Sequence, residues 1–422
     1  MKLIKIIRPR VQACIKKAIG ISWPKNDEVA SLFMHRDEEA IIERIKNKRT
    51  KNVAFFCMSI SLWKYDTLFK LMLEDPSFNP VFFISPRYDS FKVRKKEVAD
   101  MEEFCKDKHY KYVKLKSVFL YRGDDLSKYD IDIAFYSQPY SNITPRSYYY
   151  DKLKDSLLCY VPYGYLIPSK RYNYASILHT IAWKIFMPTS VSVETASLFA
   201  SSTSNMFDLG FLGYDMYQQC NPFIWKKEGM KKIVWAPHYS ISTTAWIRLS
   251  SFLDISDFMV KFAYKYKDTI QIVFKPHPHL YPSLCAEWGE KRTKEYYKKW
   301  QEMENTMLCE GDAYPVFKSS DALIHDCASF ILDYMFTQKP CLYVSFSGNL
   351  NVETGKDGTD AYNAHYHASK IEDIETFIQN IVVEGNDNMQ EQRLFVLKEH
   401  ILPKTGKDAS DNIMKCLSES LC

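Results

Sequence analysis

A chain of 422 residues that is 46% apolar, 15% aromatic and 25% charged is long enough to bury two hydrophobic cores. Its 13 glycines and 18 prolines exclude a collagen-like or low-complexity chain, and the same composition excludes a disordered one. The 11 cysteines form no CxxC pair and have no regular spacing, which indicates reduced thiols rather than a disulfide framework or a zinc site.

The net charge of +5 is concentrated at the N-terminus. Residues 1–25 carry seven basic side chains and no acidic one, so the remaining chain has 49 basic and 51 acidic residues, a net charge of about −2. This distribution does not favour a nucleic-acid-binding surface, and no nucleic acid is expected as a partner. The basic residues also interrupt any secretory signal, and no run of 18 apolar residues predicts a transmembrane helix.

Apolar residues of the first segment fall on one arc of a helical wheel, and lysines and arginines fall opposite them. Residues 1–25 are therefore predicted to form a basic amphipathic helix. Two interpretations remain open: the helix lies on an anionic membrane surface, or it packs on the body of the protein.

From residue 51 the chain alternates short apolar runs with helical patterns. The strands expected in the first half are 51–59, 80–86, 110–115, 132–137 and 157–162, with a helix near 63–73. The second half predicts strands at 232–236, 270–275, 321–325 and 340–345, with helices near 246–266, 287–304 and 330–335. This alternation predicts parallel α/β sheets in two Rossmann-like halves, with a ligand site in the cleft between them.

Three predicted strands of the second half end in polar clusters, at residues 237–240, 276–279 and 325–329. His277 follows a strand between two prolines, and beside it Lys275 supplies a fixed charge suited to phosphate. His238 follows another strand in the same way. Each histidine is either a ligand or catalytic group, or a turn residue bonded to nearby backbone.

The segment 319–335 reads as loop, strand, tight turn and helix. Ser329 stands at the start of that helix, where N–H groups and the helix dipole favour an anion. Asp326 is either part of the binding site or the cap of that helix, and Asp333 either reaches a ribose hydroxyl or faces solvent. His365 and His367 share a loop but lack a third ligand, so neither a metal nor a cofactor is expected.

The motifs W-A-P-H at 235–238, F-K-P-H-P at 274–278 and S-D-A-L-I-H-D-C-A-S-F-I-L-D-Y-M at 320–335, followed by Lys339 and Pro340, resemble the CDP-glycerol glycerophosphotransferase family. The resemblance is strongest over 230–345. It implies a GT-B fold, in which two Rossmann-like domains face each other across a cleft. The division it suggests is the N-terminal helix 1–25, an acceptor domain 50–185, a nucleotide-donor domain 186–385, and a C-terminal helix within 386–422 that returns to the first domain.

The resemblance also implies site residues. His277 matches a family histidine near the pyrophosphate, Ser329 matches a serine that helps to hold the phosphates, and Asp326 and Asp333 match acidic residues of the same segment. Ala328 stands where the family has another serine, and no histidine stands at 161–166, where the family has its proposed base. The predicted substrate-binding set is Lys275, Ser320, Asp326, Ala328, Ser329 and Asp333, and the predicted catalytic residues are His277 and His238.

The function that the resemblance implies is transfer of glycerol- or ribitol-phosphate from a CDP carrier to a hydroxyl of a surface-glycan or lipid-linked acceptor, with release of CMP. The expected location is cytoplasmic, peripheral on the inner face of the plasma membrane. A glycosyltransferase that uses a nucleotide-sugar on the same fold is the alternative, and a binding protein with a degenerate site is the third possibility.

Overall fold

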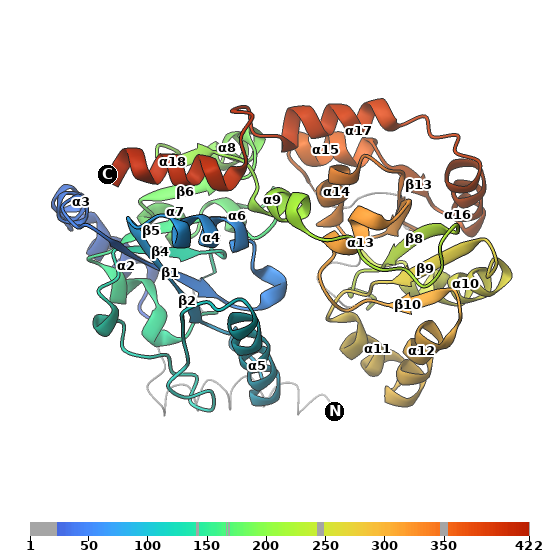
Figure 1. Cartoon of the computed structure of the whole chain (residues 1–422), viewed down its shortest axis with the longest axis horizontal. Coiled ribbons are helices and arrows are strands. Elements are labelled where there is room, and N and C mark those ends of the chain that lie inside the picture. Colours follow the sequence, from blue (N-terminus) through green and yellow to red (C-terminus); the bar gives the residue numbers. More distant parts are fainter. Residues whose placement is uncertain are drawn as a thin grey trace.

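A computed structural model describes residues 23–140, 143–165, 167, 169–242, 249–346 and 353–421. Most of the basic segment 1–25, predicted to form an amphipathic helix, lies outside these residues. The described chain forms two α/β domains, each built around its own sheet (Figure 1).

The first domain contains a seven-stranded parallel sheet with the order β3-β2-β1-β4-β5-β6-β7. Its strands are β1 (Lys51–Cys57), β2 (Phe78–Ile84), β3 (Tyr112–Val113), β4 (Ile133–Tyr136), β5 (Leu157–Tyr160), β6 (Lys184–Met187) and β7 (Met206–Asp208). Strand β4 and the part of β1 from residue 53 onward are apolar because both faces of the sheet are buried there.

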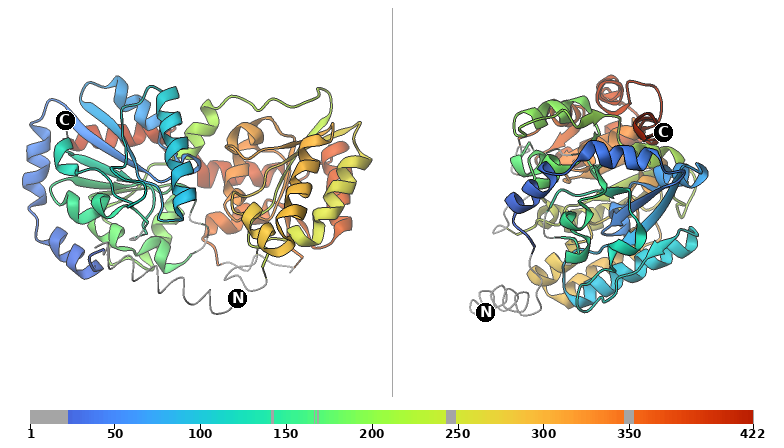
Figure 2. Two further views of the ribbon diagram at one scale, coloured as in Figure 1. Left: turned by 90° about the horizontal axis from the view of Figure 1, so that it is seen from below. Right: turned by 90° about the vertical axis from the view of Figure 1, so that its left-hand side faces the viewer.

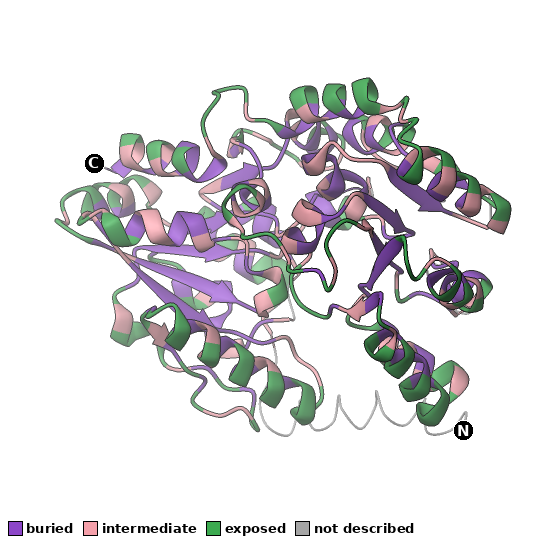
Figure 3. Ribbon diagram, turned by 45° about the vertical axis from the view of Figure 1, so that its right-hand side comes forward, coloured by how far each residue is buried: buried purple, intermediate pink, exposed green. Residues whose placement is uncertain are grey.

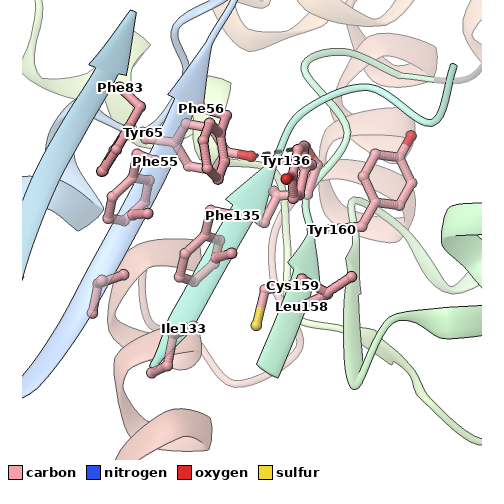
Figure 4. Close-up of a cluster of buried hydrophobic side chains, with 14 of the residues drawn as sticks. Phe55, Phe56, Tyr65, Phe83, Ile133, Phe135, Tyr136, Leu158, Cys159 and Tyr160 are labelled. Carbon is pink, nitrogen blue, oxygen red and sulfur yellow. Dashed lines mark hydrogen bonds between the residues drawn. The ribbon is translucent and has the colours of Figure 1, made fainter. Parts of the chain in front are cut away.

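Aromatic pairs lock the centre of this sheet. Phe55 of β1 stacks on Phe135 of β4 with ring centroids 4.7 Å apart, and Phe56 stacks on Tyr136 at 4.8 Å (Figure 4). These pairs are neighbours in the parallel register of the two strands. Large flat side chains in register fix the alignment of the strands, since a slip of one residue moves each ring to the opposite face.

The helical elements of the first domain connect successive strands or lead into the sheet. They are α2 (Asn26–Met34), α3 (Glu38–Lys46), α4 (Asp66–Glu74), α5 (Phe91–Asp107), α6 (Arg171–Tyr174), α7 (Ile177–Ile181), α8 (Ser190–Ser197) and α9 (Leu212–Gln219), with short 3-10 turns η1 (Ile60–Leu62), η2 (Leu126–Tyr129), η3 (Arg146–Tyr148) and η4 (Tyr150–Leu153).

The second domain contains a six-stranded parallel sheet with the order β10-β9-β8-β11-β12-β13. Its strands are β8 (Lys231–Ala236), β9 (Ile270–Phe274), β10 (Thr306–Leu308), β11 (Ala322–His325), β12 (Cys341–Val344) and β13 (Tyr366–Ala368). Its helical elements are α10 (Phe252–Lys265), α11 (Leu280–Trp288), α12 (Glu290–Glu302), α13 (Tyr314–Ser319), α14 (Phe330–Asp333), η5 (Tyr334–Thr337), α15 (Lys356–Asn363), α16 (Ile371–Thr376), η6 (Phe377–Val383), α17 (Gln390–Val396) and η7 (Leu397–Ile401). Figure 2 shows the two domains side by side.

The last helix, α18 (Ala409–Leu421), packs on the first domain, where Ile413 and Leu417 join its hydrophobic core. Asp215 of α9 anchors this return, because its buried carboxylate accepts the backbone N–H groups of Ala409 and Ser410 at 3.0 and 2.7 Å. The anchored carboxylate fixes where the helix begins.

Three expectations about elements need correction. Strand β7 belongs to the first sheet, so we propose that the domain boundary lies between α9 and β8 instead of after residue 185. The single helix expected over 287–304 is divided by Gly289, whose φ of 83° suits glycine and ends α11 before α12 begins. The helix expected over 330–335 is α14, only four residues long, continued by η5.

Burial follows the layers, with buried strands at the centre of each domain and exposed outer helix faces (Figure 3). Among the described helices, none has both the length and the apolar character needed to cross a membrane.

Candidate active site

Three histidines gather where strands β8 and β9 end. The rings of His238 and His277 lie 5.2 Å apart, and those of His277 and His279 lie 5.5 Å apart. Tyr239 packs against all three, with ring centroids 4.4 Å from His238, 4.5 Å from His277 and 5.6 Å from His279. We call these four residues the histidine cluster. The sequence predicted neither Tyr239 nor His279, although both lie in the strand-end motifs.

Backbone hydrogen bonds decide which ring nitrogen carries the proton. Nδ1 of His277 accepts the N–H of His279 at 3.1 Å, and Nδ1 of His238 accepts the N–H of Ser240 at 3.2 Å. A neutral imidazole whose Nδ1 accepts a hydrogen bond carries its proton on Nε2. Both histidines therefore present an Nε2–H donor.

The histidines of the cluster are uncharged near neutral pH. Burial, with a smaller effect of the neighbouring histidines, lowers the pKa of His277 to about 3 and that of His238 to about 4. Burial and Arg87 also lower the pKa of His279. The structure thus disfavours His277 as a cation. It also disfavours His238 as a base, because the Nδ1 lone pair of His238 is already occupied.

Asp326 positions the cluster. Its buried carboxylate accepts the N–H of His238 at 2.5 Å, the hydroxyl of Ser250 at 3.0 Å and the N–H of Ser251 at 2.8 Å. It does not cap the helix that follows it, which was the alternative interpretation, but joins β11 to the turn after β8 and to the start of α10. Burial raises its pKa to about 7.

The backbone of the second domain holds the charged end of Lys275. The Nζ atom donates to the carbonyl of Gly311 at 2.6 Å, and the side chain is buried, which lowers its pKa. Contact of Lys275 with phosphate stays a prediction, because the carbonyl of Gly311 takes only one of the three N–H groups of its ammonium. The charge of Lys275 contributes to the lowered pKa of His277.

Ser329 keeps its predicted place at the turn after β11, with an exposed side chain and no hydrogen bond to the described chain. Helix α14 is too short to have a strong dipole, and its first N–H groups, of Phe330 and Ile331, already donate to the carbonyls of Cys327 and Ala328. The N–H groups of Ala328 and Ser329 have no acceptor within the described chain. Two adjacent free N–H groups in a turn suit an anion.

Ser320 lies at the opposite end of the same strand. It precedes β11, is fully buried, donates to the carbonyl of Phe317 at 2.9 Å and lies 2.9 Å from the hydroxyl of Tyr334. The prediction that Ser320 binds substrate needs correction, because the length of β11 separates Ser320 from the histidine cluster. The sequence motif that contains it extends across both ends of β11.

Asp333 faces the first domain. Its Oδ1 atom is buried without a hydrogen-bond partner in the described chain, and burial raises its pKa to about 7, an effect that Lys64 partly offsets. Lys64 precedes α4 of the first domain and lies over the ring of Tyr314, with Nζ 4.2 Å from the centroid. The acidic side chain of Asp333 in the second domain therefore interacts with the basic side chain of Lys64 in the first domain.

Arg87 is a second residue that the first domain contributes. It follows β2, and its Nη2 atom lies 3.4 Å from Nε2 of His279. Its guanidinium reaches the histidine cluster and keeps its charge, whereas the three histidines there are neutral. Arg87 stands just beyond the carboxyl end of a predicted strand, so the rule that identified the three other clusters would also have found it.

Tyr163 occupies the segment where the resemblance expects a histidine. Its N–H donates to the carbonyl of Ser137 at 3.3 Å. Burial and the nearby Tyr239 raise the pKa of its hydroxyl, so this group is a hydrogen-bond donor and not a base near neutral pH.

The described residues hold no group of three or more His, Cys, Asp or Glu side chains arranged for a metal ion. The rings of His325 and His365 lie 5.1 Å apart, but His365 donates Nδ1–H to the carbonyl of Ala361 and His367 is exposed. A cavity of about 640 Å³ lies elsewhere, around His179 and Trp183 before strand β6, away from the cluster.

Residues 225–419, which contain β8–β13 and every site residue of the second domain, match the family model described as CDP-glycerol:poly(glycerophosphate) glycerophosphotransferase. This part of the chain, its second domain, is similar to that family of transferases. The resemblance inferred from the motifs is therefore confirmed. A search of curated proteins found no match to the chain.

Solved structures show the fold of the whole chain. A variant of the wall teichoic acid polymerase TagF is 12% identical, with 99% of each chain covered and a TM-score of 0.57. A UDP-GlcNAc 2-epimerase of Methanocaldococcus jannaschii, in complex with UDP-GlcNAc and UDP, is 13% identical over 88% of this chain and 100% of its own, with a TM-score of 0.56. The expected GT-B fold with two Rossmann-like domains is confirmed.

Proposed function

We propose that the protein transfers glycerol- or ribitol-phosphate from a CDP-linked donor to a hydroxyl of a surface-glycan or lipid-linked acceptor and releases CMP. The observation that carries the proposal is that loops after strand ends hold neutral Nε2–H donors on His238 and His277, N–H groups of Ala328 and Ser329 with no acceptor in the described chain, and the guanidinium of Arg87. All five groups are donors, which is what a diphosphate requires.

In the proposed reaction the acceptor oxygen attacks the β-phosphorus of the donor. A new P–O bond forms, the bond to the bridging oxygen breaks, and CMP leaves with the extra negative charge. The protein contributes position and electrostatic stabilisation, because the transition state spreads charge over the phosphoryl oxygens. Donors fixed by backbone hydrogen bonds, like His238 and His277, stabilise that charge without first having to reorganise.

Asp333 is the proposed base. With a pKa of about 7, a large fraction of the carboxylate is ionised near neutral pH and can accept a proton. The same pKa makes the carboxylate a stronger base than an ordinary aspartate, and a pKa near the working pH is the optimum for general base catalysis. It faces the first domain, where the resemblance places the acceptor. The side chains of His238 and Tyr163 do not suit this role, for the reasons given above.

The test is nucleotide release by the purified protein with CDP-glycerol, CDP-ribitol and a panel of UDP-, GDP- and CMP-sugars, each with and without a lipid-linked acceptor. The His277→Ala variant serves as the blank. CMP release from a CDP-polyol alone supports the proposal and identifies the polyol. Release of UDP or GDP from a sugar donor overturns it and establishes a glycosyltransferase on the same fold. If no nucleotide is released, the melting temperature is measured with and without each CDP-polyol. If no CDP-polyol raises the melting temperature, donor binding is overturned too.

A further inference from the structure

A cluster of exposed apolar side chains lies on the first domain where helix α5 begins, at the lower edge of that domain in Figure 1. Phe119 is 73% exposed, and Phe91, Val93 and Leu120 are also exposed. The rings of Phe91 and Phe119 lie 5.8 Å apart, so the helix start and the turn at 117–122 present one surface. Exposed apolar side chains that gather in this way mark an interaction site.

The turn at 117–122, which we call the tip of this surface, is rigidly held. Buried Arg94 of α5 donates from Nε to the carbonyl of Val118 at 3.3 Å and from Nη2 to that of Phe119 at 3.2 Å. Ser117 and Arg122 pair across the base of the turn, and the hydroxyl of Tyr121 donates to the carbonyl of Ile143 at 2.7 Å. Three independent anchors hold the turn in place, so that Phe119 stays exposed and packs only its ring edge against Phe91.

Basic side chains surround this tip. A groove of about 420 Å³ along the edge strand β3 is lined by Lys111, Lys114, Lys116 and Lys128. Lys114 pairs with Glu102 and Lys128 pairs with Asp124, but Lys111 and Lys116 have no ion-pair partner in the part of the chain described.

Exposed Lys92, Lys95, Lys96 and Arg122 extend the positive surface on the other side of the tip. Two acidic residues nearby are paired with basic ones, since Asp89 lies 3.7 Å from Arg87 and Asp124 lies 3.0 Å from Lys128.

We propose that this surface, formed by the start of α5, the turn at 117–122 and the lysine groove, docks on an anionic phospholipid bilayer. The apolar tip enters the interface between headgroups and acyl chains, and the lysines lie against the anionic headgroups, with the groove wide enough to receive one. A basic rim around an apolar tip fits an anionic bilayer better than a protein surface. A bilayer offers anionic headgroups and apolar acyl chains side by side at every point of its surface.

The surface is continuous with the active site. Tyr88 packs on Tyr121 at 5.0 Å, and Arg87, the next residue, reaches His279. Docking therefore places the entrance of the site at the membrane, where a lipid-linked acceptor is held. This last step rests on the proposed function, whereas docking itself does not.

The test is sedimentation of the full-length protein with vesicles of phosphatidylcholine alone or with 30% phosphatidylglycerol, a composition chosen on the order of a natural anionic membrane. We expect binding to the anionic vesicles that weakens as salt rises. Phe119→Ser with Leu120→Ser, and separately Lys111→Glu with Lys116→Glu, should each weaken binding about ten-fold or more. The matched control, Ile224→Ser with Lys267→Glu on the second domain, should bind normally.

Normal binding by both surface variants overturns the proposal. If the double variant Lys5→Glu with Arg8→Glu then loses binding, docking is assigned to the N-terminal segment instead. Equal binding to both kinds of vesicle, or binding to neither, also overturns it. A melting temperature within two or so degrees of the wild type shows that each variant is folded. CMP release with a soluble acceptor should stay normal in the surface variants, which separates docking from the chemistry.

Discussion

The carboxylate of Asp326 accepts the backbone N–H of His238 at 2.5 Å, although the two residues belong to different strand ends and lie 88 positions apart in the chain. The same carboxylate accepts two further hydrogen bonds at the start of α10. Asp326 is thus a positioning residue, which fixes the backbone that aims the ring of His238.

Replacing Asp326 by Asn should lower both stability and turnover. An amide nitrogen offers donors where the neighbours also donate, so at least one buried hydrogen bond is lost, at a cost of about 2 kcal/mol in the free energy of unfolding. We expect kcat to fall by about ten-fold or more as His238 shifts. Denaturant unfolding and CMP release measure the two effects.

The matched control is Asp215→Asn, which removes a buried carboxylate with three similar hydrogen bonds from the first domain. It should lose comparable stability but keep normal kcat below its melting temperature. An equal loss of kcat in both variants would show that Asp326 acts only through global stability.

His277→Ala should reduce kcat/KM for the CDP-polyol by about 10²-fold, because it removes a fixed Nε2–H donor from the phosphate site. The alanine variant should stay folded, since the ring is held only by one N–H and by ring contacts. His35→Ala, at an exposed histidine on the far side of the first domain, is the control. Normal turnover in the His277 variant would exclude this histidine from the reaction.

Arg87→Ala should raise KM and lower kcat, together by about 10²-fold in kcat/KM, because it removes a permanent charge that the first domain extends toward the histidines. Arg87→Lys should recover part of the loss, since charge returns without the planar fork. Arg49→Ala, an exposed arginine ahead of β1, should behave as wild type. The proposed role fails if Arg87→Ala binds and turns over the donor normally.

The activity should rise with pH through the pKa of Asp333, which is about 7, and then level off, because only the ionised carboxylate accepts a proton. Asp333→Asn should be slow, by about 10²-fold, and should lose this dependence. Glu97, on α5, has a pKa that burial also raises to about 7, so Glu97→Gln is the control and should retain the profile. A profile unchanged in shape in Asp333→Asn would assign the base elsewhere.

The stability of the protein should depend on the neutral state of His277. Its pKa in the folded protein, about 3, is below the unfolded value of about 6.5, so the unfolded chain binds more protons between these values. Stability therefore falls as pH falls below about 6.5. Asp326 and Asp333, with raised pKa values, act in the opposite sense, but they do so equally in the wild type and in His277→Gln.

The measurement is thus the difference in unfolding free energy between the wild type and His277→Gln at pH 7.5 and pH 5. The variant should gain on the wild type as the pH falls, by about 1.4 kcal/mol for each pH unit well below 6.5. A difference that does not change with pH would mean that the ring of His277 has the same pKa in the folded protein as in the unfolded chain.

The apolar runs of the sequence determined the parallel strands, because a strand buried on both faces is mostly apolar, as in the runs that end β1 and β8 and in the whole of β4. They also determined that His238, His277 and Asp326 stand at strand ends, since parallel strands end at one edge.

Only the tertiary structure decided what each side chain does there. Lys275 donates to the carbonyl of Gly311, and Asp326 accepts two backbone N–H groups and one hydroxyl. Ser320 lies at the opposite end of β11 from the cluster, and Arg87 comes from the other domain. Strand periodicity depends on neighbours in sequence, whereas a hydrogen bond or a charge depends on groups that are distant in the chain and meet only when a domain has folded or, for Arg87 and His279, when the two domains have packed together.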